Sequence, residues 1–69
     1  MQAEMLGRVE EYLRDKLASP DISLKQSASD PDMAEVYVGD EFVGTLYKDD
    51  EDGETSFDFN MSILESDVG

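Results

Sequence analysis

The densest group of residues that could bind a ligand or do chemistry is the run Asp49 to Glu54, in which five carboxylates surround one glycine. Carboxylate oxygens are ligands that Ca²⁺ prefers, and an EF-hand loop places them at fixed positions. When Gly53 takes the sixth position of such a loop, Lys48 falls at the first position and Phe59 at the twelfth, where the motif needs acidic ligands. We therefore expect no specific calcium site, and we interpret the run as a solvated hairpin turn in which Gly53 adopts a positive φ.

Residues for covalent or acid–base catalysis are scarce. The chain contains no histidine and no cysteine, so the commonest general base and the commonest thiolate ligand are both missing. Paired carboxylates could hydrolyse a glycosidic bond, but that reaction also needs a cleft for a sugar, which a chain this short rarely builds. Neither glycine-rich phosphate-binding motif is present. We expect a protein that is not an enzyme and that holds no metal and no cofactor.

The apolar residues of segment 3–17 recur at intervals of three and four positions, which predicts an amphipathic helix. The apolar stripe consists of Met5, Leu6, Val9, Tyr12, Leu13 and Leu17. Glu10 and Arg14 stand one helical turn apart and form a favourable pair on the polar side. Pro20 ends the helix, because the residue before a proline is pushed towards extended geometry.

Four short segments with the pattern of strands follow the helix. Segment 22–26 alternates apolar and polar residues, and segments 34–38 and 42–47 are rich in β-branched and aromatic residues. Segment 56–63 has the clearest alternation, with Phe57, Phe59, Met61 and Ile63 on one side. Short connections favour an antiparallel meander with the helix packed on one face. We predict a single α+β domain over residues 1–69, in the order α-β-β-β-β, with a frayed tail at residues 65–69.

A glycine followed by aspartate between two strand segments is typical of a two-residue type II′ hairpin turn. Such a turn at Gly39-Asp40 places Val36 opposite Val43 and Tyr37 opposite Phe42. One face then holds Ala34, Val36, Val38, Val43, Thr45 and Tyr47, and the other holds Tyr37, Phe42 and Leu46.

The position of the helix decides what the group Tyr37, Phe42 and Leu46 does. If the helix covers the valine face, these three side chains form an exposed apolar patch of the kind that marks partner surfaces. If the helix covers their own face, they belong to the core. A three-residue loop would exchange the two groupings, and both alternatives stay open at this point.

The charge of the chain is strongly asymmetric. Five lysine and arginine residues face eighteen acidic residues, for a formal charge of −13. Residues 28–69 hold thirteen of these carboxylates and a single cation, Lys48. Such a surface repels nucleic-acid phosphates and anionic membranes, so we expect direct binding to neither. No secretory signal and no apolar stretch long enough to span a membrane is evident, so we expect a cytoplasmic protein.

Two stretches resemble a known family. They are residues 34–44, AEVYVGDEFVG, and residues 56–64, SFDFNMSIL, with the acidic turn between them and the short helix before them. Together they are similar to a family of small alphaproteobacterial proteins catalogued only as a domain of unknown function. The resemblance covers nearly the whole chain and implies a bacterial cytoplasmic protein. Its motifs are structural, so it carries over no catalytic or binding residue.

These observations favour a protein-interaction module that presents an acidic surface to a basic protein partner, in its sharpest form as a mimic of nucleic acid. The candidate partner-binding residues are Tyr37, Phe42, Leu46, Asp49, Asp50, Glu51, Asp52 and Glu54. The alternative is weak binding of a divalent cation through the Asp49–Glu54 turn. The small core and sparsely protected edge strands favour a homodimer, whereas the doubled negative charge opposes one, so the oligomeric state also stays open.

The acidic residues generate the first prediction, since folding brings their carboxylates closer together than an expanded chain does. Salt screens this repulsion, with a Debye length of about 10 Å at about 0.1 M. We expect the midpoint of thermal unfolding to be higher in about 0.3 M than in about 0.02 M NaCl. The double substitution Asp50→Asn, Asp52→Asn should reduce the difference. Thermal unfolding followed by circular dichroism measures both, and a midpoint that falls with added salt would show that the carboxylates are paired.

Overall fold

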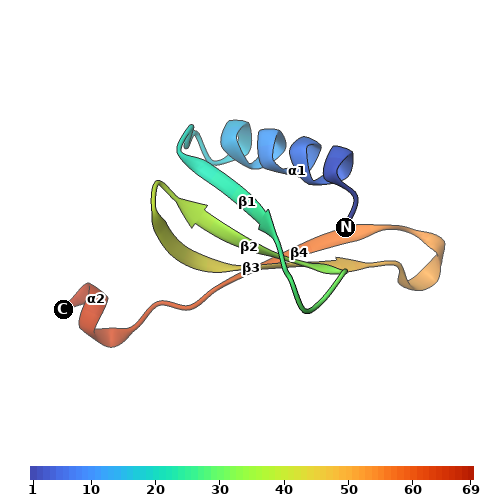
Figure 1. The fold of residues 1–69 in the computed structure, drawn as a ribbon. Helices are drawn as coiled ribbons and strands as arrows, with labels where there is room; N and C mark the ends of the chain where they lie inside the picture. Colours follow the sequence, from blue (N-terminus) through green and yellow to red (C-terminus); the bar gives the residue numbers. More distant parts are fainter.

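A computed structural model describes residues 1–69, except for the side chain of Asp52. Helix α1 (Ala3–Lys16) precedes four strands, β1 (Ile22–Gln26), β2 (Met33–Val38), β3 (Glu41–Asp49) and β4 (Ser56–Met61). A short 3-10 turn, η1 (Glu51–Gly53), joins β3 to β4, and a one-turn helix, α2 (Glu65–Val68), follows β4. The strands form one antiparallel sheet in the order β1-β2-β3-β4 (Figure 1). This arrangement confirms the predicted α+β meander.

Helix α1 ends at Lys16, one residue earlier than the sequence predicts. Leu17 caps the helix, and Ala18 adopts a left-handed conformation with a φ of 50°. The amide of Ser19 then donates to the carbonyl of Arg14 at 2.9 Å, and the amide of Ala18 donates to Asp15 at 3.3 Å. These two bonds satisfy carbonyls at the end of the helix in the manner of a Schellman motif. The turn, with Pro20 just beyond it, directs the chain back into β1.

Two side chains of α1 bind the backbone of β1, which is one edge of the sheet. Glu10 accepts a hydrogen bond from the amide of Leu24 at 2.9 Å, and Arg14 Nε donates to the carbonyl of Ile22 at 2.7 Å. Glu10 and Arg14 also pair with each other at 3.2 Å, as the sequence predicts. The unpaired backbone groups of an edge strand can bind other chains. Here side chains of α1 occupy two of these groups, the Ile22 carbonyl and the Leu24 amide.

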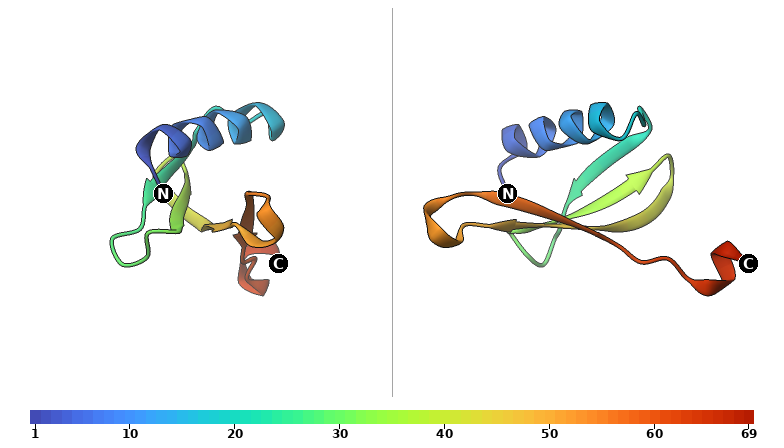
Figure 2. Two further views of the ribbon diagram at one scale, coloured as in Figure 1. Left: turned by 90° about the vertical axis from the view of Figure 1, so that its right-hand side faces the viewer. Right: turned by 180° about the vertical axis from the view of Figure 1, so that it is seen from behind.

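The core lies between α1 and the face of the sheet beneath it. Its fully enclosed members are Ile22, Ala34, Val36 and Leu46, and the partly buried Leu6, Val9 and Leu13 of α1 pack against them. Figure 2 shows α1 lying along one side of the sheet, over its β1 edge. The apolar stripe of the helix therefore faces the sheet, with the backbone of α1 close to β1 and its side chains reaching over the core residues of β2 and β3.

The β2–β3 hairpin contains a β-bulge that the sequence does not reveal. Tyr37 lies opposite Phe42, as predicted, but Val36 lies opposite Gly44 rather than Val43. Val43 is therefore an extra residue on β3. An extra residue moves every later side chain of its strand to the opposite face. The predicted grouping of Leu46 with Tyr37 and Phe42 is thus wrong: Leu46 shares the helix-facing side with Ala34 and Val36 and is only 1% exposed.

The turn between β2 and β3 has the backbone that the sequence predicts. Gly39 has a φ of +62°, and Asp40 is not among the residues with positive φ. A type II′ turn needs a positive φ at its first central residue only, which a glycine adopts without steric cost. The prediction of a two-residue turn at Gly39-Asp40 is confirmed, and the error in the register arises later in the chain, at Val43.

Gly44 permits the close approach of β3 and β4. A Cβ atom built on Gly44 would clash with the carbonyl oxygen of Asn60 and would lie 3.0 Å from Cε1 of Phe59. Gly7, in the middle of α1, has no atom within 4 Å of such a Cβ. The two glycines therefore have opposite effects on stability.

We predict that Gly44→Ala lowers the free energy of unfolding by about 1–3 kcal/mol, because the β4 backbone must shift. Gly7→Ala should raise it by up to about 1 kcal/mol, since alanine has the higher helix propensity. Chemical denaturation of both variants beside the parent chain measures the two changes. Equal effects of the two substitutions would contradict the close β3–β4 approach.

Candidate protein-interaction surface

An open apolar groove of about 370 Å³ lies between α1 and the β3–β4 half of the sheet. Leu46 is part of its lining, the half-buried Phe57 and Phe59 come from β4, and α1 contributes the opposite wall. The residues from α1 are Met5, Arg8, Val9, Tyr12 and Leu13. Tyr12 is 61% exposed although it belongs to the apolar stripe. The groove thus combines apolar walls with one cation, Arg8.

The groove exists because one helix is too narrow to cover the sheet. An α-helix with its side chains is about 10–12 Å wide, whereas neighbouring strands lie about 4.8 Å apart. A single helix therefore covers about two strands. Because Glu10 and Arg14 hold α1 over the β1 edge, the apolar side of β4 lacks the same cover.

The face of the sheet away from α1 carries aromatic side chains. Tyr37 and Phe42 contact each other edge to face, with ring centroids 5.8 Å apart and an interplanar angle of 75°. Phe42 is 53% exposed, and Tyr47, which the bulge moves to this face, is 42% exposed. Two of the three predicted patch residues are therefore together at the surface, and Tyr47 stands in place of Leu46.

The Tyr37 hydroxyl donates a hydrogen bond to Glu35 Oε1 at 3.1 Å. Glu35 precedes Tyr37 by two positions on β2, so the two side chains share one face. This hydrogen bond, together with partial burial and the negative charge of Glu35, raises the pKa of the Tyr37 phenol above its ordinary value. The phenol thus stays protonated as a donor across the neutral range.

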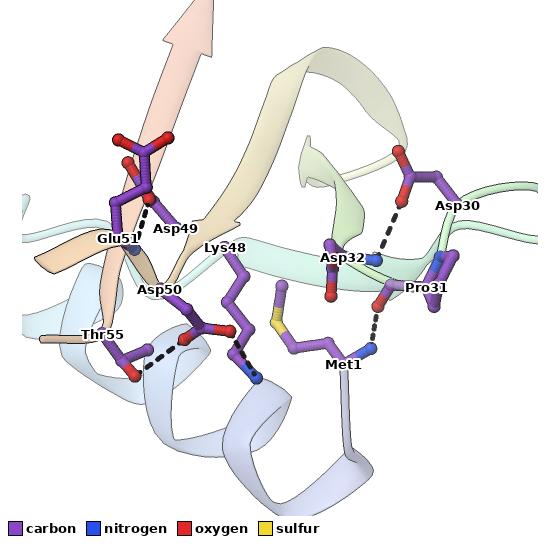
Figure 3. Close-up of polar contacts among 9 residues, drawn as sticks. All are labelled: Met1, Asp30, Pro31, Asp32, Lys48, Asp49, Asp50, Glu51 and Thr55. Atoms are coloured by element: carbon purple, nitrogen blue, oxygen red, sulfur yellow. Dashed lines mark hydrogen bonds and ion pairs between the residues drawn. The ribbon is translucent and has the colours of Figure 1, made fainter. Parts of the chain in front are cut away.

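The acidic turn uses two of its carboxylates to hold its own shape. Asp49 Oδ1 accepts a hydrogen bond from the amide of Glu51 at 2.9 Å (Figure 3). Asp50 Oδ1 accepts from the Thr55 hydroxyl at 2.8 Å, and its other oxygen lies 3.7 Å from Lys48 Nζ. Gly53 has a φ of +74°, as predicted. Asp50→Asn therefore weakens an ion pair as well as removing a repelling charge.

The rest of the turn faces solvent. Glu51 and Glu54 are exposed, whereas the predicted contribution of Asp52 lies outside the described side chains. Among the residues whose positions are described, no three acidic side chains are grouped so that they could hold a metal ion.

A second network of hydrogen bonds lies nearby, in the loop before β2 (Figure 3). The carboxylate of Asp30 accepts a hydrogen bond from the amide of Asp32 at 2.9 Å, and the amino group of Met1 donates to the carbonyl of Pro31.

Sequence reasoning located the acidic turn and the Tyr37–Phe42 pair but missed the groove. Periodicity assigned Tyr12, Phe57 and Phe59 to an apolar interior, without indicating how many strands the helix covers. A comparison of the width of one helix with that of a four-stranded sheet could have indicated the groove.

No helix of the described chain has the length and apolar character needed to cross a membrane.

Comparison with known proteins relates the chain to one family of unknown function. The family model described as "Protein of unknown function (DUF3126)" matches residues 5–67. A search of curated proteins and a search of solved structures each found no match. The matched range includes most of α1, all four strands and most of α2.

The Tyr37–Glu35 contact predicts a displaced titration. We expect the pKa of Tyr37 to lie above the ordinary tyrosine value, and Glu35→Gln to lower it because the negative charge is lost. NMR titration of the Tyr37 ring in the parent chain and in the variant measures the change. Glu4→Gln, a change of equal charge on α1, should leave the pKa of Tyr37 unchanged.

The same contact has a consequence for stability. A folded-state pKa above the unfolded value of about 10 means that the contribution to stability is fully present below that pH and is lost as pH rises through the folded pKa. If Glu35→Gln leaves the pKa of Tyr37 unchanged, the hydrogen bond to Glu35 does not persist in solution.

Proposed function

The chain belongs to the DUF3126 family, and we propose that it is a protein-interaction module that binds a basic protein partner. The role is binding rather than catalysis, because the sequence has no histidine and no cysteine and most of its described carboxylates are exposed on the surface. The proposal rests above all on exposed negative charge without matching cations.

The imbalance of charge is concentrated after residue 27. Residues 28–69 contain thirteen carboxylates and one cation, Lys48, which lies beside Asp50. Most of these carboxylates are exposed: Asp32, Asp40, Glu41, Asp50, Glu51, Glu54, Asp58, Glu65 and Asp67. A surface of this kind attracts basic proteins, accelerates their association and disfavours acidic ones.

Apolar contacts complement the charge. The groove beside α1 is lined mainly by apolar side chains, and Phe42 and Tyr47 are exposed on the other face. Aromatic side chains in the buried centre of an interface contribute most of its affinity, whereas charged rims contribute mainly specificity and rate. A basic partner with apolar anchors therefore matches this surface better than a purely cationic one.

Nothing specific favours the alternative of a divalent-cation site. Asp49 and Asp50 already accept hydrogen bonds from Glu51 and Thr55 within the turn. The finer form of the proposal, in which the chain mimics nucleic acid, requires that its partner also bind nucleic acid at the same site. A nucleic-acid duplex should then compete with the chain for its partner, whereas an ordinary acidic interface has no such competitor.

The proposal predicts salt-sensitive capture of basic proteins. The immobilised chain should retain basic proteins from a bacterial lysate at low salt and release them at high salt, as read out by mass spectrometry. Glu51→Gln and Glu54→Gln should lower the recovery, because they remove two exposed negative charges from the turn. Neither side chain accepts a hydrogen bond from another described residue, so the turn should keep its shape.

The matched control neutralises two exposed carboxylates on α1, Glu4→Gln and Glu11→Gln, and so changes the net charge equally. This control should retain more of the basic proteins than the turn variant does. Recovery that resists salt, or that falls equally in the two variants, would contradict an interface formed by the acidic turn between β3 and β4.

A further inference from the structure

The two edges of the sheet differ in what binds them. At β1, Glu10 and Arg14 of α1 occupy backbone groups of Leu24 and Ile22. At β4, the other edge, no side chain of the described residues binds the backbone between Ser56 and Met61. An edge strand without such cover presents a row of unpaired donors and acceptors to any extended chain.

The side chains of β4 divide into two rows of different chemistry. Phe57 and Phe59 face the groove beside α1, and Met61, which is 55% exposed, continues their row. Ser56, Asp58 and Asn60 form the opposite row and are exposed. The edge therefore offers apolar neighbours on the α1 side of the sheet and one carboxylate, Asp58, on the other side.

We propose that the basic partner adds an extended segment to β4 as a fifth strand, in which apolar residues alternate with lysine or arginine. The apolar residues of that strand contact Phe57 and Phe59, beside the groove, while a basic residue lies across from Asp58. Main-chain hydrogen bonds give affinity in such complexes, and the alternate side chains give specificity. This inference rests on the proposed function and specifies the binding mode and the partner sequence.

Charge selects a basic partner over a second copy of this chain. The apolar row of β4 could also pair with itself, but each copy carries a formal charge of −13 and each β4 edge carries Asp58. Bringing two such edges together opposes like charges, which destabilises cross-strand pairs, whereas opposite charges stabilise them. The same carboxylate thus disfavours self-pairing and favours a basic strand.

Synthetic peptides test the binding mode directly. The probe is a short peptide in which valine and lysine alternate, with blocked termini, and its control has glutamate in place of lysine. Two further peptides carry backbone N-methyl groups at all valines or at all lysines. In an added antiparallel strand, the amides of alternate residues point to the same side, so only one of these two sets can face β4.

We expect the parent peptide to bind and to protect backbone amides of β4 from hydrogen exchange, while the glutamate peptide does not bind. One N-methylated peptide should lose at least about tenfold in affinity, because several main-chain bonds are removed, and the other should bind like the parent. Asp58→Lys should weaken binding about fivefold more than Asp67→Lys, a change of equal charge on α2.

Other results would overturn strand addition. If both N-methylated peptides bind like the parent, or if both weaken equally, main-chain pairing is not involved, although attraction to a basic ligand stands. If the alternating peptide does not bind at low salt, strand addition is wrong, and capture of basic proteins from lysate decides the proposed function separately. If β4 amides become protected as the protein concentration rises without peptide, the occupant is a second copy.

Discussion

The bulge at Val43 determines which side chains of β3 lie beneath α1. With Val43 as an extra residue, Leu46 enters the core and Tyr47 turns to the open face. The bulge also brings Gly44 opposite Val36, at the position where a side chain would collide with β4. The core, the close packing of β3 and β4, and the aromatic surface all depend on this one change of register.

The course of the chain follows from local sequence signals. The alternation of residues 22–26 defines β1 at both ends, and the glycine of Gly39-Asp40 defines its turn, because only short-range geometry is involved. The predicted end of α1 was one residue too late, because Ala18 adopts a left-handed conformation that is usually taken by glycine. The bulge could not be predicted, since residues 41–47 alternate plausibly in either register.

The candidate surface was predictable in composition but not in arrangement. Glu51 and Glu54 are exposed as a charged turn must be, whereas Asp49 and Asp50 also stabilise the turn through Glu51 and Thr55. The groove depends on the lateral position of α1. That position results from the hydrogen bonds of Glu10 and Arg14 to β1. The periodicity of a segment does not indicate such a contact with another segment.

The contact of α1 with β1 also limits how many molecules a strand-mediated assembly can contain. A filament built by edge pairing needs two accessible edges on each subunit, so that every addition leaves a new one. Glu10 and Arg14 occupy two backbone groups at the β1 edge of this sheet, whereas no side chain among the described residues covers the β4 edge. If a partner strand adds to β4 as proposed, the side chains of α1 therefore prevent further growth at β1, and the assembly stops at a stoichiometry of one to one.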